Sequence, residues 1–394
     1  MANGVNNNAF NKRVYGLIII KSKNSNFNAD FTGNPRRLPD KDGTIFATDK
    51  AIKYAIRKYW VDKGKNVFVW RSRKDDGDLR TRDERMEFFK NKFKDDYLKT
   101  ELEYLSWLEN HTDGNIGNNQ SENNNNLIAA ILKKIKDENI SSNKEKKKLI
   151  DEEIKKIKTL ITAKIFANCI DTKLFGVTYT GEGPVSLTGP VQISYGINKY
   201  AENLIFVSDI ITPYPTGEES THQGSVGKET KSLEIYYVYD FSINPDNILT
   251  HYEDNEEIKK LFQIKQEDIN NLKEALKYAV TKLDTTSKKG SENVMLLWIE
   301  LPENSKKFLP EMKDLVKIEK GENGKVKISL GKIKELFEKA NIVSNDNINN
   351  DYNIELYYSF PFTDIENWDI SNILDLLSEN SEQENTNNNQ VTQE

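Results

Sequence analysis

Long apolar stretches of the chain predict the strands of a mixed α+β fold. Residues 14–22 (VYGLIIIKS) and 294–301 (VMLLWIEL) are rich in β-branched and large apolar side chains, as expected of central strands. Residues 233–241 place apolar side chains at alternate positions, which indicates a strand with one buried face. Weaker signals of the same kind predict further strands at residues 66–70, 191–195, 204–211, 316–319, 326–330 and 354–360.

Between these strands, apolar residues three and four positions apart predict amphipathic helices. The first covers residues 48–60, with Thr48 as its expected N-cap and Asp49 in the first turn. A capping box of Ser142 and Glu145 marks the start of another, long helix. The other helical patterns cover residues 127–140, 144–169 and 269–283, and one more helix ends near residue 341.

Two segments interrupt this order of elements. Residues 65–168 are mostly helical and form a predicted insertion, and residues 212–232 are rich in Pro, Gly and Ser and form a long loop. Without them the order is strand, helix, strand, strand, helix, strand, which is the split βαβ arrangement of ferredoxin-like and RNA-recognition (RRM) folds. The predicted domains are an RRM-like domain at 1–64 and 169–302, the insertion, a C-terminal accessory segment at 303–377 and a disordered tail at 378–394.

Charge is distributed unevenly along the chain, although the formal net charge is only −6. Residues 1–100 contain 23 Lys and Arg against 13 Asp and Glu, a net charge of +10, so the remainder carries −16. All nine arginines lie at or before Arg85. Because Arg can bind a phosphate group through two parallel hydrogen bonds, this bias suggests a surface that faces a polyanion. A solvated charged face is the alternative.

Two groups of cations stand out within this basic part of the chain. The sequence NPRR at residues 34–37 lies in a loop held open by proline, so its arginines are expected to be presented rather than folded away. Lys50, Lys53 and Arg57 share one face of the predicted first helix. The plainer interpretation of that helix face is a solubilising outer surface.

The single cysteine, Cys169, excludes an intrachain disulfide and is compatible with a reducing cytoplasm. Because it lies in an apolar helical run, we expect a buried structural thiol rather than a nucleophile. The longest apolar run near the start, residues 14–20, is too short to span a membrane and lacks the flanks of a signal peptide. A cytoplasmic location without a membrane partner is therefore expected.

Catalytic chemistry finds little support in the sequence. The three histidines are isolated, and no spacing typical of a metal site or a catalytic triad is present, so neither metal nor cofactor is expected. The sequence GSVGKE at 224–229 is similar to a phosphate loop, but His222 replaces the first glycine and Glu follows the Lys. Tyr236, Tyr237 and Tyr239 have the chemistry to stack on bases, although packing in the core is the preferred interpretation.

Two short motifs are too particular to be generic turns, LFG at residues 174–176 and TGPVQ at 188–192. Together with Lys-x-Lys-Asn at 21–24, Pro-Arg-Arg at 35–37 and the first helix, they resemble the backbone subunit of the type I-B CRISPR effector complex (Cascade), a crRNA-binding RAMP protein of the seven family. The resemblance spans most of residues 14–302 and is weak after residue 301.

The resemblance implies a fold built like a hand, with an RRM-like palm, fingers at 65–168 and a thumb at 209–232. It implies a non-catalytic scaffold that polymerises head to tail along the CRISPR RNA and presents the RNA to target DNA in antiviral defence. The expected partners are CRISPR RNA, target DNA, other copies of the chain and other Cascade subunits. The expected RNA-binding residues are Lys21, Lys23, Asn24, Asn34, Arg36, Arg37, Lys50, Lys53, Arg57, Gln192, His222 and Lys228.

Two other functions stay open at this point. Relatives in type III complexes cut target RNA with a divalent metal and an aspartate in the loop after the first strand, and Asp30 occupies a comparable loop. That loop reads NFNAD at 26–30, whereas the family often has a Gly-Asp-Pro-Asn-like sequence. The LFG and TGPVQ motifs favour the scaffold over this metal-dependent endoribonuclease. A small-molecule enzyme is the third possibility, because a ferredoxin-like fold does not fix a function.

Overall fold

The computed structural model describes residues 9–114, 116, 125–211, 226–249, 252, 255–344, 346–359, 363–370 and 373–376. Over these residues the chain has ten α-helices and four β-sheets, so the fold belongs to the α+β class. None of the described helices combines the length and the apolar character that a membrane span requires.

The chain divides into two compact units. Unit 1 comprises Met1–Lys63, Val191–Asn244 and Lys265–Glu394, and unit 2 comprises Gly64–Pro190 and Pro245–Ile264. Unit 2 is larger than the predicted insertion at 65–168, because residues 169–190 and 245–264 pack with its helices.

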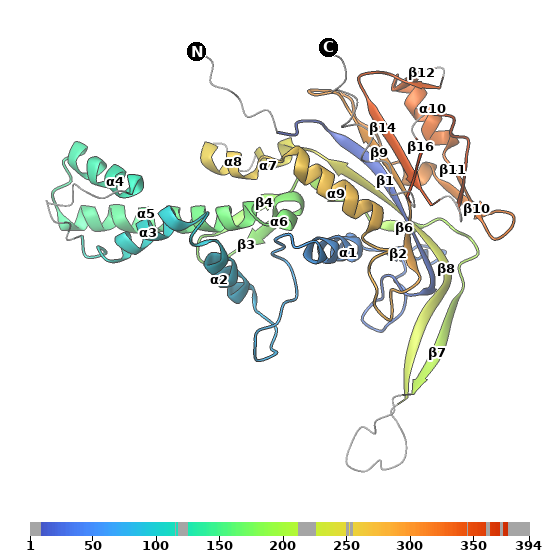
Figure 1. The fold of residues 1–394 in the computed structure, drawn as a ribbon, viewed down its shortest axis with the longest axis horizontal. Helices are drawn as coiled ribbons and strands as arrows, with labels where there is room; N and C mark the ends of the chain where they lie inside the picture. The colour runs from blue at the N-terminus through green and yellow to red at the C-terminus, as the bar shows by residue number, and fades with distance from the viewer. Residues whose placement is uncertain are drawn as a thin grey trace, which may run out of the picture. The chain divides into compact units, whose positions relative to one another are not determined.

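Unit 1 is built on a nine-stranded sheet, in which strands β16-β14-β9-β1-β8-β6-β2 follow one another in space (Figure 1). Two more strands, β5 and β7, also pair with β8. The strands are β1 (Val14–Ser25), β2 (Phe46–Ala47), β5 (Val191–Ile193), β6 (Gly196–Asn198), β7 (Ile205–Ile211), β8 (Val226–Ile243), β9 (Ser291–Glu300), β14 (Asn353–Tyr358) and β16 (Ile373–Asp375).

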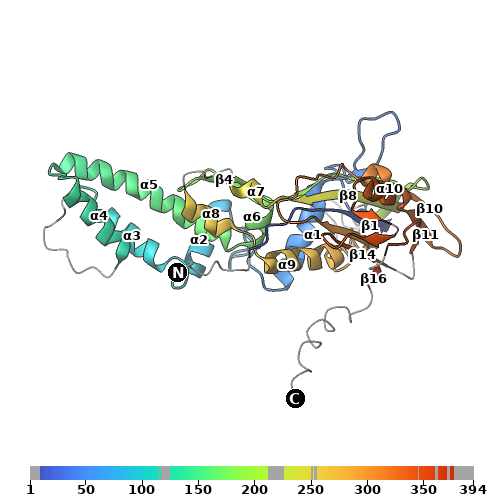
Figure 2. The same cartoon turned by 90° about the horizontal axis from the view of Figure 1, so that it is seen from above.

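Four strands and two helices form the centre of unit 1. The strands β9, β1, β8 and β6 lie side by side in that order, and every neighbouring pair is antiparallel. Helix α1 (Asp49–Asp62) follows β1 in the chain, and α9 (Gln266–Tyr278) follows β8. The two helices contact each other, and α9 packs on β9. Figure 2 shows them on one side of β1 and β8.

The start of α1 differs from the expected cap. Thr48 occupies the N-cap position, but its side chain accepts no hydrogen bond from the helix. Its hydroxyl instead donates to Oδ1 of Asn28 at 3.1 Å, and its backbone nitrogen donates to the same atom at 2.8 Å. The residue therefore joins the helix to the preceding loop.

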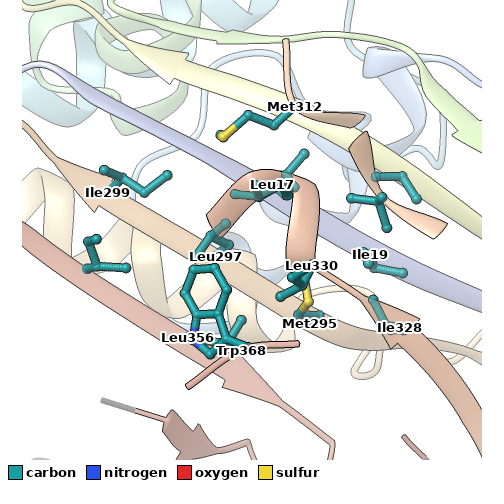
Figure 3. Packing of buried hydrophobic residues seen from close by; sticks show 14 of the residues in the cluster. Leu17, Ile19, Met295, Leu297, Ile299, Met312, Ile328, Leu330, Leu356 and Trp368 are labelled. Atoms are coloured by element: carbon teal, nitrogen blue, oxygen red, sulfur yellow. The ribbon is translucent and has the colours of Figure 1, made fainter. Parts of the chain in front are cut away.

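The opposite face of the sheet is covered by the C-terminal elements of unit 1. Leu17 and Ile19 of β1 pack there with Leu297 and Ile299 of β9, with Trp368 and with other residues after position 300 (Figure 3). Each fully buried side chain of this size contributes about 1.5–3 kcal/mol. The covering elements are β10 (Lys317–Lys320), β11 (Val326–Ser329), α10 (Gly331–Lys339), β12 (Val343–Ser344), β13 (Asn347–Ile348), β15 (Thr363–Glu366) and the short 3-10 helix η1 (Lys313–Leu315).

The three tyrosines of β8 are core residues. Tyr236, Tyr237 and Tyr239 are each no more than 2% exposed. Tyr236 belongs to the cluster beneath the C-terminal elements, and Tyr237 packs against Phe27 with their ring centres 5.7 Å apart. The preference for core packing over base stacking is confirmed.

Residues 226–232 were predicted to lie in a loop but continue β8, where they pair with β7. The sequence pattern misses them because the side chains of residues 227–231 are exposed or half-buried, so burial imposes no alternation on this part of the strand. Residues 212–225, which include His222, and the predicted tail at 378–394 lie outside the described residues.

Unit 2 is a group of helices with a two-stranded sheet. Its long central helix starts after Ser142, the predicted N-cap, whose Oγ accepts a hydrogen bond from the backbone nitrogen of Glu145 at 3.2 Å. The predicted capping box is only half formed, because the carboxylate of Glu145 accepts from the Ser142 hydroxyl, at 2.9 Å. Cys169 is fully buried in its core, as predicted. The elements are α2 (Arg82–Phe93), α3 (Lys99–Glu109), α4 (Asn126–Asp137), α5 (Asn143–Ala167), α6 (Ile170–Phe175), β3 (Gly176–Tyr179), β4 (Val185–Thr188), α7 (Asp246–Leu249) and α8 (Glu256–Phe262).

The strand predicted at residues 66–70 is not formed. Side chains replace the neighbouring strand that this segment would need. The buried carboxylate of Asp171 accepts hydrogen bonds from the backbone nitrogens of Phe68 and Val69, at 2.7 and 2.9 Å. The buried guanidinium of Arg85 donates to the carbonyl oxygens of Val67 and Phe68.

Candidate nucleic-acid interface

The arginines predicted to face a polyanion lie in a folded loop between β1 and β2, which we call the Arg loop (residues 26–45). Asp30 organises its first turn, because its Oδ1 atom accepts hydrogen bonds from the hydroxyl of Thr32 and from the backbone nitrogens of Thr32 and Asn34, at 2.7–3.0 Å. The hydrogen bond from the Thr32 side chain is the main cause that lowers the pKa of Asp30. Asn34 is thus part of the turn that presents the arginines.

Arg36 and Arg37 differ in how they are held. Arg37 is exposed, and its guanidinium donates to the carbonyl oxygen of Gly43 at 2.7 Å, which closes the second turn of the loop. Arg36 is half-buried, and its Nε atom is buried without a hydrogen-bond partner among the described residues. Native proteins rarely leave a buried donor unsatisfied, and such groups are found at functional sites.

The cations of α1 form a second group. Nζ of Lys50 and Nζ of Lys53 lie 2.7 and 3.2 Å from the carboxylate of Asp49. Burial acts to raise the pKa of Asp49, but its bonds to these two lysines outweigh burial and lower the pKa below the ordinary value. Burial lowers the pKa of Lys53, and the nearby charge of Arg57 lowers it further. Asp49 thus holds Lys50 and Lys53 together at the start of α1, and Arg57 lies near enough to Lys53 to act on its charge.

Hydrogen bonds and ring contacts connect the Arg loop to α1 and to the segment that contains β5 and β6. The bonds from Thr48 to Asn28 fix the loop at the start of the helix. The backbone nitrogen of Asn198 in β6 donates to the carbonyl oxygen of Ile45, the last residue of the loop, at 3.0 Å. Next to it, the ring of Phe46 in β2 lies 5.3 Å from that of Tyr195, between centroids. The pKa of Lys50 is raised by its bond to Asp49 and, to a smaller extent, by Tyr195. The structure therefore brings the Arg loop and the first turn of α1 together.

Lys21 and Lys23 lie on the other face of the sheet. Lys21 is paired in register with Tyr236, which belongs to the core cluster under the C-terminal elements, whereas α1 contributes no residue to that cluster among the described positions. Nζ of Lys21 lies 2.9 Å from Glu292, and Nζ of Lys23 lies 3.7 Å from Glu234. Neighbouring strands thus supply a carboxylate to each lysine.

The remaining predicted residues lie at separate places in unit 1. Asn24 is exposed in a left-handed conformation, with φ of 51°, near the end of β1. Gln192 of β5 lines a cavity of 340 Å³ that also contains Asp240 and Glu311, an acidic surrounding for an RNA contact. Lys228 is exposed on the β7–β8 hairpin, opposite Asp209.

Three residues of this region were missed by sequence reasoning. Phe31 is 97% exposed in the Arg loop, and an aromatic residue within a polar loop is the signal that marks it. Asn26 is buried beneath the loop, and Lys288 donates to the carbonyl oxygens of Asn26 and Phe27, at 3.0 and 2.6 Å. Burial lowers the pKa of Lys288. No local pattern could have found Lys288, because it lies more than 260 positions from its partners.

The LFG motif and the first residues of TGPVQ meet in unit 2, where Gly176 of β3 pairs with Thr188 of β4. Within the part of the chain that the structure describes, no three His, Cys, Asp or Glu side chains gather as metal ligands would.

The profile of the family described as CRISPR-associated protein Cas7 matches residues 12–336. No curated protein matches the sequence. Among solved structures, a chain described as "CRISPR RNA-guided surveillance complex, pre-nicking" is similar at 13% identity and a TM-score of 0.46, covering 92% of this chain and 96% of that chain. Another, described as "CRISPR RNA-guided surveillance complex", has 11% identity and a TM-score of 0.42, covering 92% and 94%.

Because the family match covers well over half of the 394 residues, the chain belongs to the CRISPR-associated protein Cas7 family.

Proposed function

We propose that this chain is the non-catalytic backbone subunit of a type I-B Cascade effector complex. In this role it polymerises head to tail along a CRISPR RNA and presents the RNA for pairing with target DNA in antiviral defence. The observation that carries the proposal is the family match over residues 12–336. Such a scaffold reads the backbone and shape of the RNA, while base pairing reads the sequence.

The topology of unit 1 supports an RRM-like palm. The spatial order β9-β1-β8-β6 is fourth, first, third, second in chain order, with antiparallel neighbours and a helix after the first and third strands. This is the order of a split βαβ fold. We keep the palm at 1–64 and 169–302, the fingers at 65–168, the thumb at 209–232 and the accessory segment at 303–377 as proposed boundaries.

The burial of the sheet separates this palm from a typical RNA-recognition domain. Such domains stack bases on aromatic residues of an open sheet face. Here one face packs under α1 and α9 and the other under the C-terminal elements, and the tyrosines of β8 are buried. The RNA is therefore assigned to the Arg loop and the start of α1 rather than to the sheet.

The Arg loop and α1 offer the chemistry that a sugar-phosphate strand requires. Arg36, Arg37, Lys50, Lys53 and Arg57 supply the charge, and exposed Phe31 supplies an aromatic surface. Proteins that bind single strands without sequence preference combine these two features. The ion pairs of Lys21 and Lys23 and the acidic surroundings of Gln192 give these three residues weaker support as RNA ligands.

Purification from cells that express a CRISPR array tests the function. We expect the protein to carry RNA of defined length, and the mass of the reconstituted assembly to increase with the length of the RNA, since head-to-tail contacts need not close. A monomer, or a closed oligomer whose mass does not depend on the presence or length of RNA, would contradict the proposal and favour an enzyme.

A further inference from the structure

The β7–β8 hairpin leaves the sheet where the end of β1, the middle of β8 and the start of β9 meet. Ser25 of β1 pairs with Ser232 of β8, and Ser22 pairs with Ser291 of β9. All four serines are at most 4% exposed. We call these residues the serine junction.

The hydroxyl groups of the serine junction bond to one another and to the backbone. Oγ of Ser25 lies 2.8 Å from Oγ of Ser22 and 3.2 Å from Oγ of Ser291. The hydroxyl of Ser232 donates to the carbonyl oxygen of Ser25 at 2.8 Å. Buried polar networks of this kind fix one arrangement of the groups they connect. The hairpin therefore leaves the sheet in a defined direction.

Asn26, the first residue of the Arg loop, connects the β7–β8 hairpin to the first turn of the loop. Its side-chain nitrogen donates to the carbonyl oxygen of Thr230 in the hairpin, at 3.1 Å, and to that of Gly33 in the loop, at 3.0 Å. Its Oδ1 atom is buried and has no partner among the described residues. A buried acceptor without a partner costs about 1–3 kcal/mol, so stability alone would not favour an asparagine here.

Lys288 binds the backbone at the start of the Arg loop. Its ammonium group donates to the carbonyl oxygens of Asn26 and Phe27, and the backbone nitrogen of Asn26 donates to the carbonyl oxygen of Ser287 at 2.9 Å. The lysine is thus used beneath the loop rather than on its surface.

We propose that Asn26 and Lys288 are positioning residues, which fix the Arg loop against the base of the β7–β8 hairpin so that both meet one RNA strand in a set geometry. The loop supplies Arg36, Arg37 and Phe31, and the hairpin supplies exposed apolar side chains such as Phe206 and Val207. The inference rests on the proposed function, because it assigns RNA to these two elements.

A double-mutant cycle in the full-length protein tests the inference. Asn26→Ala and Lys288→Met are each combined with Arg36→Ala plus Arg37→Ala, and binding of a labelled unstructured RNA is measured at one salt concentration. We expect each positioning variant to weaken RNA binding about five- to tenfold in the wild-type background. In the background that lacks Arg36 and Arg37 we expect a loss of less than about twofold, since the effects of mutations at coupled residues are not additive. Equal losses in both backgrounds would overturn the proposal.

Hydrogen exchange without RNA gives a second, independent measurement. Both variants should speed exchange in residues 27–38 and in residues 226–232 together. Asn125→Ala is the control, because it removes another buried amide, which bonds to Thr100 and Leu127 in unit 2 and belongs neither to the loop nor to the serine junction. Unchanged exchange in the two segments, or an equal change in the control, would overturn the inference. Failure of the wild-type chain to bind RNA would overturn the proposed function, and exchange would still test the positioning.

Discussion

The two motif glycines, Gly176 and Gly189, lie back to back in unit 2. A Cβ atom on Gly176 would lie 2.4 Å from the backbone nitrogen of Gly189, and one on Gly189 would lie 2.3 Å from that of Gly176. Gly176 also has φ of 83°, a conformation that other residues rarely adopt. The close approach explains in physical terms why LFG and TGPVQ carry glycine at these positions.

Gly189→Ala should therefore destabilise the protein by about 2–4 kcal/mol, because neither backbone can move aside without breaking the β3–β4 pairing. Urea unfolding measures the change. Gly227→Ala is the control, since a Cβ there would meet its nearest atom only at 4.0 Å. A loss at Gly189 no larger than at Gly227 would contradict the packing argument.

A pH dependence is expected from Asp240, whose carboxylate accepts hydrogen bonds from the backbone nitrogens of Met312 and Lys313, at 2.7 and 3.0 Å. Burial raises its pKa to about 6, against the lowering effect of these bonds. The folded state therefore holds the proton more tightly than the unfolded chain. The stabilising contribution is complete below about pH 4 and is lost as pH rises through about 6.

The free energy of unfolding of the wild type, minus that of Asp240→Asn, should accordingly fall by about 2 kcal/mol between pH 4 and pH 7. Taking the difference cancels the other carboxylates, which titrate in both proteins. A difference that stays flat across this range would show that Asp240 does not titrate there.

Arg36→Ala combined with Arg37→Ala should weaken binding to all RNA sequences alike. The dependence of log affinity on log salt concentration should flatten by about 1.4, since each single-strand phosphate contact contributes about 0.7. Arg36→Lys with Arg37→Lys should retain most of the slope. Lys306→Ala with Lys332→Ala removes two exposed charges elsewhere in unit 1 and serves as the control. Loss of binding to one sequence only would indicate base recognition instead.

Phe31→Ala should lower RNA affinity by about 1–3 kcal/mol through loss of stacking, and the salt slope should not change because no charge is removed. Exposed Phe308→Ala provides a comparison, because it removes an aromatic ring from the surface of unit 1 outside the Arg loop and α1. If Phe31→Ala leaves RNA affinity intact and instead reduces assembly of the chain, Phe31 contacts protein rather than RNA.

Asp30→Ala should disturb the turn of the Arg loop, and it should not change nuclease activity, because we expect the wild type to have none. We expect neither the wild type nor the variant to cut guide-complementary RNA in the presence of Mg²⁺, because Oδ1 of Asp30 already accepts three bonds within the loop. Cleavage that requires both the metal and Asp30 would replace the scaffold with the endoribonuclease alternative.

Sequence patterns predicted the elements that are determined by nearby residues or by burial of a continuous apolar run. The stripe of α1, the N-cap Ser142 of α5 and the apolar runs of β1 and β9 are visible within short windows, and the structure confirms them. The pattern failed at residues 66–70, where the backbone is held by Asp171 and Arg85. These partners lie some 17 to 100 positions away, and no window includes both.

The RNA-binding role of the candidate site stays a prediction, and the structure bears only on where its residues lie. Charge alone pointed to Arg36, Arg37 and the α1 cations, and the structure brings the loop and the helix start together. Lys21 and Lys23 show the limit, because their carboxylate partners belong to strands more than 200 positions away. Positions that depend on pairing across the sheet cannot be assigned from their neighbours in sequence.

Strand β8 runs from Val226 to Ile243 without interruption, with its first part in the hairpin and the rest beside β1. At about 3.3 Å per residue, this strand is about 60 Å long, and its second part is fixed in the centre of the sheet. A force that a neighbouring molecule applies to the hairpin is therefore transmitted along β8 to the centre of the sheet, where hydrogen bonds to the strands on both sides resist bending.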